Sequence, residues 1–273
     1  MKLSRSLPLA CLLATTLAAP VYAGAIHDAG LFTNILSGND DNSTGPVGLG
    51  FTANINGTNY ANAYVNNNGN ITFDNVLSSY TPAAIQTGSF GPIIAAYFGD
   101  VDTRASGSGK VTYGASTLDG VNVFGVNYIN VGVYSQQPIY NSFQLILTDR
   151  SAIGAGDFDI QFNYDSILWE AGTASGAGTG GLGGVSALAG YWTSNTSNAT
   201  LAGSLVNGAF IDGGPNALIS GSRNSNTLGQ YNFQVRNGAV VVPPNDIPEP
   251  ASLALMGVAL FGMVLTLKKR RAS

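Results

Sequence analysis

Several short segments of the chain alternate between apolar and polar residues. In Phe158–Tyr164 every second side chain is aromatic or Ile, and the side chains between them are polar. Tyr231–Arg236 repeats this pattern, and Asn141–Thr148 follows it more loosely. Because successive side chains of a β-strand point to opposite faces, a period of two predicts strands with one buried and one solvated face.

Two segments depart from this alternation in different ways. Pro92–Phe98 is apolar throughout, which is typical of a central strand covered on both faces. Val121–Val133 is long and mixed in polarity, so it predicts either a pair of strands or one bulged strand.

Turn-forming dipeptides separate the apolar segments. Asn68-Gly69 lies between Tyr64-Val65 and Ile71–Phe73, and this arrangement predicts a β-hairpin. Ala171–Gly190 holds eight glycines in twenty positions and predicts a loop. Further turn signals are Asn56-Gly57, Asp119-Gly120, Asn207-Gly208 and Asp212-Gly213. About ten strand candidates, with no helical stripe between the two ends of the chain, predict an all-β, antiparallel β-sandwich.

The N-terminal 23 residues have the three parts of a secretory signal peptide. Two basic residues precede an apolar stretch from Leu7 to Ala19, and small residues occupy the positions one and three before the expected cut. We expect cleavage between Ala23 and Gly24. The chain's single cysteine, Cys11, lies inside this segment, so the exported protein is expected to lack disulfides and thiolate metal ligands.

The C-terminal end, residues 248–273, also has the composition of a targeting signal. Pro248, Glu249 and Pro250 precede Ala251–Leu267, seventeen residues without a charge, and a basic tail follows at 268–271. As a helix this stretch would be about 25 Å long, at the short limit for a transmembrane span. The tail should stay on the cytoplasmic side. A permanent anchor is one interpretation. The other is a processing site, because prolines on both sides keep the tripeptide out of the helix.

These three parts, in this order, resemble the PEP-CTERM sorting signal of Gram-negative bacteria. The resemblance implies an exosortase-type processing enzyme as a partner, which would cut near the tripeptide. It implies an inner-membrane-anchored precursor held by the C-terminal helix, and a secreted or cell-surface product. Such proteins typically come from bacteria that make exopolysaccharide.

The body between the two ends is acidic. Residues 24–246 contain five basic and fourteen acidic residues, a net charge of −9. Scattered basic residues on an acidic body offer no phosphate-binding footprint, so we expect no nucleic-acid partner. The length suits one sizeable core, and we assign residues 24–242 to one domain and 243–247 to a linker.

Eight segments of the body carry a resemblance to a known domain. They are Tyr64–Phe73, Ile93–Arg104, Gly109–Tyr113, Phe124–Tyr134, Asn141–Arg150, Gly156–Glu170, Gly190–Trp192 and Tyr231–Arg236. Together, over roughly residues 45–238, they resemble the nidogen-type extracellular domain, NIDO. The resemblance implies a β-sandwich with a role at the cell surface or in the extracellular matrix, without catalysis. Cell–matrix adhesion, or a contribution to exopolysaccharide and biofilm structure, would follow from it, with a polysaccharide or matrix protein as the partner.

Asp100 and Asp102 form the polar cluster that is the strongest candidate for metal binding or catalysis. Residues two apart on a strand share a face, roughly 6.6 Å apart. Two carboxylates at that separation could bind Ca²⁺, or could act as the acid and base of an inverting glycosidase. They could also accept hydrogen bonds from the turn and pair with Arg104. Asp40-Asp41 is a similar candidate on weaker grounds. Apart from Ca²⁺, we expect no cofactor.

The alternative function is a carbohydrate-active enzyme that acts on exopolysaccharide through Asp100, Asp102 or Glu170. The only histidine, His27, lies near an N-terminus that we expect to be loose, which disfavours Ser-His-Asp catalysis and zinc. Several aromatic side chains either stack on sugar rings or pack in the core. These are Tyr128, Tyr134, Tyr140, Tyr191 and Trp192.

Overall fold

The computed structural model describes residues 24–241. The predicted signal peptide, the linker at 243–247, the tripeptide and the transmembrane helix at 251–267 lie outside the described residues. Within 24–241, no helix is long and apolar enough to cross a membrane. The helical segments described are four single turns of 3-10 helix, namely η1 (Ala29–Leu31), η2 (Ile85–Thr87), η3 (Thr173–Ser175) and η4 (Leu218–Ser220).

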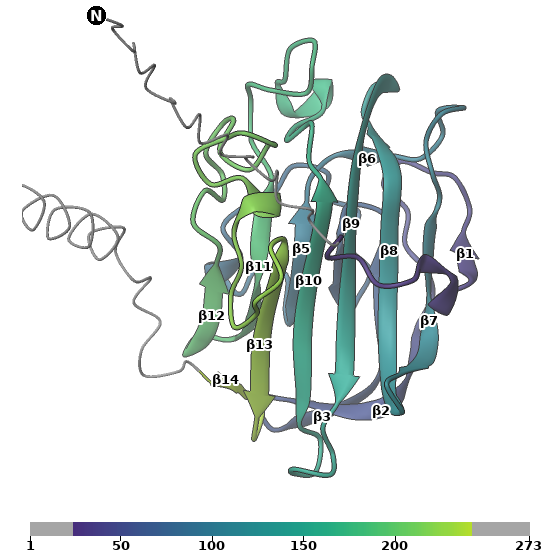
Figure 1. Ribbon diagram of the computed structural model, residues 1–273, viewed down its shortest axis with the longest axis vertical. Helices are drawn as coiled ribbons and strands as arrows, with labels where there is room; N and C mark the ends of the chain where they lie inside the picture. The colour runs from purple at the N-terminus through teal and green to yellow at the C-terminus, as the bar shows by residue number, and fades with distance from the viewer. Residues whose placement is uncertain (1–23, 242–273) are drawn as a thin grey trace, which may run out of the picture.

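The body is all-β, as the alternating pattern predicts, and consists of two antiparallel sheets that face each other (Figure 1). The first sheet has the order β1 (Asn34–Leu36), β7 (Val111–Leu118), β8 (Val121–Val133), β9 (Gln137–Asp149), β10 (Phe158–Ser166), β13 (Gln230–Arg236) and β14 (Ala239–Val241), with β6 (Val101–Asp102) paired to β8. The second sheet has the order β12 (Ser197–Thr200), β11 (Leu188–Ser194), β5 (Ile93–Phe98), β4 (Asn70–Thr72), β3 (Thr58–Asn66) and β2 (Val47–Ile55).

The predicted strands form where their patterns place them. In β10, Phe158, Ile160 and Phe162 are buried, and the polar residues between them are partly exposed. All six residues of β5 are buried, because this strand lies between β4 and β11 with side chains covered on both faces. Val121–Val133 is one strand, and its register against β9 shifts between Tyr128 and Val131, which confirms the bulged alternative.

The main core lies between the sheets and is rich in aromatic side chains. Trp169 is fully buried, and its ring meets the Tyr97 ring edge-on at a centroid distance of 5.8 Å. Tyr128 stacks on Phe143 at 4.6 Å. The buried hydroxyl of Tyr97 donates to the Trp169 carbonyl, so these large side chains fill the core without leaving that polar atom unsatisfied.

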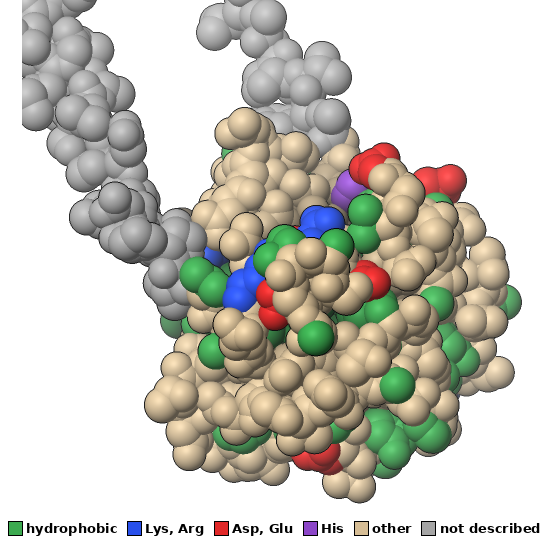
Figure 2. Space-filling view, turned by 90° about the horizontal axis from the view of Figure 1, so that it is seen from below, with side chains coloured by type: hydrophobic (Ala, Val, Ile, Leu, Met, Phe, Trp, Pro, Cys, Tyr) green, Lys and Arg blue, Asp and Glu red, His purple; other side chains and the backbone are tan. Residues whose placement is uncertain are grey.

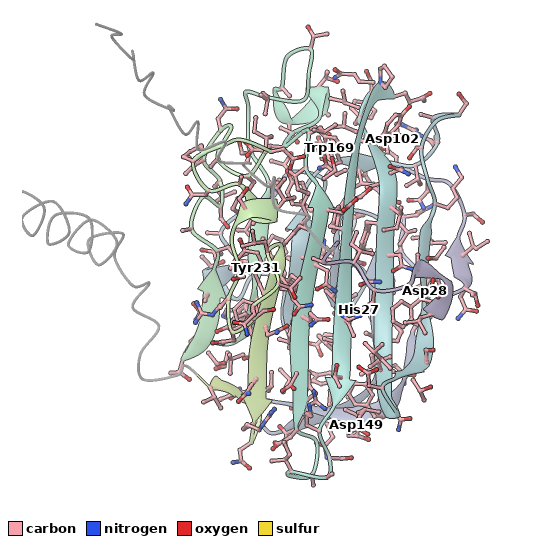
Figure 3. The ribbon with its side chains drawn as sticks, in the orientation of Figure 1. His27, Asp28, Asp102, Asp149, Trp169 and Tyr231 are labelled. Atoms are coloured by element: carbon pink, nitrogen blue, oxygen red, sulfur yellow. The ribbon has the colours of Figure 1, made fainter. Side chains whose placement is uncertain are left out.

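The first described residues pack against the outer face of the first sheet, so the expectation of a loose segment around His27 is wrong. The His27 amide donates to Gln144 Oε1 at 3.1 Å, and the ring Nε2 lies 2.9 Å from Gln161 Oε1. Phe32, 1% exposed, packs with Val123 on this outer face. These contacts, together with hydrogen bonds from Gln144 Nε2 to the His27 carbonyl and from Asn127 Nδ2 to the Ala29 carbonyl, hold the segment across the strands, where Figure 3 labels His27.

The Asn68-Gly69 turn joins β3 to β4 as predicted and is itself a core element. Gly69 has φ +78°, and its carbonyl accepts the Tyr97 amide of β5 at 3.0 Å. A Cβ at Gly69 would lie 1.7 Å from the Tyr97 carbonyl oxygen. By contrast, Gly57, in the β2–β3 turn, has φ +84° and open space around it. The two glycines share a left-handed φ and differ in their surroundings.

This contrast predicts different costs for the same substitution at the two turns. Gly57→Ala should lower the free energy of unfolding by about 1–2 kcal/mol, the cost of the left-handed conformation for alanine. Gly69→Ala should lower it by at least roughly 2 kcal/mol more, because the new methyl group also collides with β5. Denaturant unfolding of both variants measures the difference. Equal losses would show that the β3–β4 turn does not dock against Tyr97.

Candidate functional site

Three carboxylates from two distant segments meet at one end of the sandwich. One ligand oxygen each from Asp40, Asp41 and Asp100 lies within 4.8 Å of the others. Asp40 and Asp41 belong to the connection between β1 and β2, and Asp100 follows β5. Figure 3 labels Asp102, two residues beyond Asp100, near the upper end of the molecule. We call Asp40, Asp41 and Asp100 the acidic cluster.

Asp102 has a different set of contacts from Asp100, although the sequence pattern joins them as a pair. Its Oδ1 accepts from the Arg104 amide and from Arg104 Nε, both at 2.9 Å, and its Oδ2 accepts from Arg104 Nη2 at 2.7 Å. The Asp102 side chain is fully buried. Both oxygens are therefore engaged by Arg104, which is the pairing that the sequence left open as an alternative to metal binding and catalysis.

The carboxylates of the cluster are partly or fully buried, and their negative charges repel one another. Burial first, and then the negative charges of Asp40, Asp41 and Asp102, raise the pKa of the Asp100 carboxyl to about 7, against the opposing charge of Arg104. Burial and the same kind of repulsion raise the pKa of Asp40 to about 6. Arg104 reaches Asp40 Oδ2 at 3.0 Å. One guanidinium is thus shared between Asp40 and Asp102, while no basic residue within 24–241 forms an ion pair with Asp100.

The asparagines of the β3–β4 turn hold the two segments together. The Asn67 side-chain amide donates to the carbonyls of Asp40 and Val101. The Asn68 amide donates to Asp41 Oδ1 at 2.9 Å, and its carbonyl oxygen accepts the Val101 amide at 2.9 Å. Both asparagines are buried. Sequence reasoning found this turn and missed its role in the site. The signal was a run of asparagines inside a hydrophobic strand pair, where buried amides need partners.

Glu170, a candidate catalytic residue of the enzymatic alternative, is also hydrogen-bonded within the protein. Its carboxylate accepts the Gly208 amide at 2.6 Å and the Phe210 amide at 2.7 Å, and the residue is fully buried. A carboxylate that receives two backbone amides fixes the conformation of the loop that donates them. Glu170 therefore holds the segment between β12 and η4 against the end of the core.

The aromatic candidates divide between core and surface. Tyr128 and Tyr191 are buried, 0% and 3% exposed, so they pack in the core and do not form a sugar platform. Tyr134, Tyr140 and Trp192 are partly exposed. Arg104 lies over the Tyr134 ring, 5.9 Å from its centroid.

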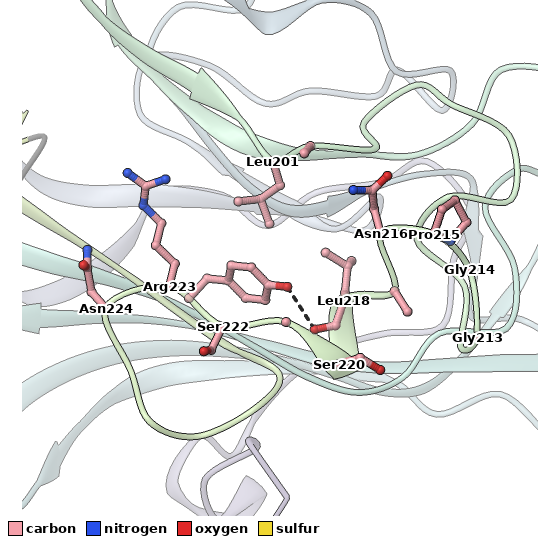
Figure 4. Close-up of a pocket in the computed structure, with 14 residues that line it drawn as sticks. Leu201, Gly213, Gly214, Pro215, Asn216, Leu218, Ser220, Ser222, Arg223 and Asn224 are labelled. Atoms are coloured by element: carbon pink, nitrogen blue, oxygen red, sulfur yellow. Dashed lines mark hydrogen bonds between the residues drawn. The ribbon is translucent and has the colours of Figure 1, made fainter. Parts of the chain in front are cut away.

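A cavity of about 590 Å³ lies between the β12–η4 loops and β13 (Figure 4). Tyr231 lines it, and its hydroxyl donates to the Leu218 carbonyl at 3.2 Å. Exposed Asn216 and Ser222 and the Arg223 side chain add polar groups. Its lining contains no carboxylate. The described lining therefore combines apolar side chains with amide, hydroxyl and guanidinium groups.

The lower end of the sandwich carries few charged side chains. Figure 2 shows mostly uncharged polar side chains and backbone there, with basic side chains next to acidic ones. Asp159 is paired with Arg150 at 2.5 Å and with Arg236 at 2.7 Å. On this face the basic residues are neutralised by acids and do not form a phosphate-binding patch.

Fold and site together define an all-β module. Of its described candidate carboxylates, Asp102 and Glu170 accept hydrogen bonds from the protein itself, and Asp100 lies in the acidic cluster. Residues 61–237 match the nidogen-like domain, NIDO, so the chain belongs to this family. Residues 246–271 match the PEP-CTERM protein-sorting motif. The two matches indicate an exported, cell-surface protein with a sorting signal for exosortase processing.

Three curated relatives carry the name alpha-tectorin. The Gallus gallus protein is 30% identical over 226 residues, which cover 72% of this chain and 10% of the relative. The Mus musculus and Homo sapiens proteins are each 30% identical over 234 residues, 76% of this chain and 10% of the relative. The chain therefore spans about a tenth of the length of these relatives. No solved structure matches the chain.

The Glu170 contacts predict a loss of stability on a nearly isosteric change. Glu170→Gln replaces one acceptor with an NH₂ group that faces a backbone amide, so the free energy of unfolding should fall by roughly 2–3 kcal/mol. Asp165→Asn, at an exposed carboxylate five residues earlier, is the matched control and should stay within about 0.5 kcal/mol of the parent. Urea unfolding followed by fluorescence measures both. A parent-like Glu170→Gln would contradict the structural role.

Proposed function

We propose that the exported protein acts at the cell surface or in the extracellular matrix of a Gram-negative bacterium. There it contributes to cell–matrix adhesion or to exopolysaccharide and biofilm structure, without catalysis. An exosortase-type enzyme first removes the tail near Pro248, Glu249 and Pro250, so the membrane helix at 251–267 holds only the precursor. The observation that carries the proposal is the presence, in one chain, of a nidogen-like domain followed directly by a sorting motif.

The contacts of the carboxylates support binding over hydrolysis. An inverting glycosidase needs an acid and a base that face a shared substrate space, about 6.5–9.5 Å apart. The Asp102 carboxylate accepts hydrogen bonds from Arg104, and the Glu170 carboxylate accepts hydrogen bonds from two backbone amides. Asp100 is 2% exposed. These contacts leave the three carboxylates of the enzymatic alternative without an open approach for a sugar chain.

The cavity beside Tyr231 favours a polysaccharide as the partner. It joins an apolar floor, which includes Leu201 and Leu218, to amide, hydroxyl and backbone groups around its rim. Sugar rings have apolar faces and hydroxylated edges, and ligand sites combine these two kinds of surface. Arg223, which also lies over the Phe233 ring, adds a positive charge near the cavity for acidic sugars. We therefore place polysaccharide contact at this cavity.

A deletion strain complemented with different versions of the gene tests location and role together. The full chain should restore biofilm and surface attachment, and the exported protein in the medium or matrix should lack the residues beyond about Glu249 by mass spectrometry. A chain without residues 248–273 should be exported but should not reach the cell surface or matrix, because it lacks the sorting signal. The double variant Asn216→Ala/Ser222→Ala should reduce retention on the strain's own exopolysaccharide several-fold, because both exposed side chains line the cavity.

The matched control is Asn122→Ala/Ser151→Ala, which alters the same two residue types at exposed positions outside the cavity. This variant should retain exopolysaccharide as the parent does. Two outcomes contradict the proposal. One is intact residues 268–271 on the mature protein. The other is release of sugar from exopolysaccharide by the purified protein, with Asp102→Asn abolishing the release; this would establish the enzyme instead.

A further inference from the structure

The acidic cluster contains anionic oxygens that the protein itself does not satisfy. Asp100 is 2% exposed, and its Oδ2 is buried without a hydrogen-bond partner among the described residues. Asp40 Oδ1 is also buried and unpartnered. A buried carboxylate oxygen without a donor is strongly destabilising unless another positive group reaches it. Arg104 reaches Asp40 only at the other oxygen, Oδ2.

The geometry around these oxygens is compact and held in place. A Cβ at Gly172 would lie 2.1 Å from Asp100 Oδ2, so the glycine leaves the space that this carboxylate occupies. Across the cluster, the Thr103 amide donates to the Asn39 carbonyl at 2.9 Å, and the Asn39 amide donates to Thr103 Oγ1 at 2.9 Å. With the Asn67 and Asn68 amides, these bonds place the oxygens before any ligand arrives.

The charge balance calls for a cation of more than one charge. Asp40, Asp41, Asp100 and Asp102 together carry four negative charges when ionised, and Arg104 contributes one positive charge in direct contact. Lys110 lies nearby, but its Nζ donates to the Thr103 carbonyl. A bound divalent ion would offset two of the three remaining charges and would accept the unpartnered oxygens as ligands.

The ligand chemistry selects Ca²⁺ among divalent ions. The cluster offers only oxygen donors, whereas zinc favours histidine and cysteine. Ca²⁺ accepts flexible carboxylate geometry, whereas Mg²⁺ demands a near-ideal octahedron and keeps several of its waters. Three carboxylates whose ligand oxygens lie within 4.8 Å of one another therefore favour Ca²⁺. Extracellular calcium modules bind at about 0.1–1 mM, a range matched to concentrations outside the cell.

We propose that Asp40, Asp41 and Asp100 bind one Ca²⁺ ion that joins the β1–β2 connection to the end of β5. Asp102 is a positioning residue, because it orients Arg104 toward Asp40. By joining these two segments, the ion stabilises this end of the sandwich once the protein is outside the cell. The site is separate from the polysaccharide cavity, so this inference stands or falls independently of the proposed function.

Thermal unfolding of the purified exported protein, in EDTA, in CaCl₂ and in MgCl₂, tests the site. Ca²⁺ at roughly a hundredfold excess over its Kd should raise the Tm by about 5–10 °C, and Mg²⁺ should raise it far less. Asp100→Asn should abolish the Ca²⁺ shift. In EDTA the same variant should unfold at the parent's temperature or above it, because it removes a buried charge from beside two carboxylates.

Asp41→Asn gives a second reading if Asp100→Asn fails to fold, because an asparagine oxygen can still accept the Asn68 amide. It should bind Ca²⁺ at least tenfold more weakly by calorimetry. Asp119→Asn, in an exposed turn that asparagine tolerates, is the control and should keep the full shift. The proposal is overturned by a Tm that is the same in EDTA and CaCl₂, by an equal response to Mg²⁺, or by a full Ca²⁺ shift in Asp100→Asn.

Discussion

The arrangement of this molecule depends on burying the amide-rich turn between β3 and β4. Gly69 lets the turn approach β5, where it bonds to the Tyr97 amide. The side chains of Asn67 and Asn68 then reach the β1–β2 connection on one side and Val101 on the other. Buried amides must be paired, so the turn specifies where both neighbouring segments lie. The positions of Asp40, Asp41 and Asp100 follow from these bonds.

The scarcity of basic residues explains why this end of the sandwich carries unbalanced charge. The body has five basic residues for fourteen acids, and Arg150 and Arg236 pair with acids elsewhere. Among the described basic residues, Arg104 alone forms ion pairs with carboxylates around the cluster, and it is shared between Asp40 and Asp102. An excess of buried negative charge is costly to the fold by itself. In the proposed calcium site, this charge binds a divalent cation outside the cell, and the sorting motif marks the protein for export.

Local features of the sequence predict the local structure well. The alternation in Phe158–Tyr164, the apolar β5 and the Asn-Gly turns each depend on neighbours in the chain, and the structure has all of them. The cluster could not be predicted in the same way. Asp40 and Asp100 are brought together by strand order, which sequence spacing does not encode, whereas the spacing of Asp100 and Asp102 suggested a pair. Likewise, the contacts of His27 with Gln144 and Gln161 are tertiary, so they cannot be read from a segment that looks like a free terminus.

Hydrogen exchange of the backbone amides, measured in EDTA, tests most directly whether the buried turn organises this end of the sandwich. The amide of Asn67 donates to the Asn42 carbonyl, that of Val101 to Asn68 Oδ1, and that of Thr103 to the Asn39 carbonyl. The account predicts that these three amides exchange as slowly as those of Phe124 and Leu145 in the central strands, through global unfolding. Exchange as fast as that of the glycine-rich loop at 176–184 would contradict it.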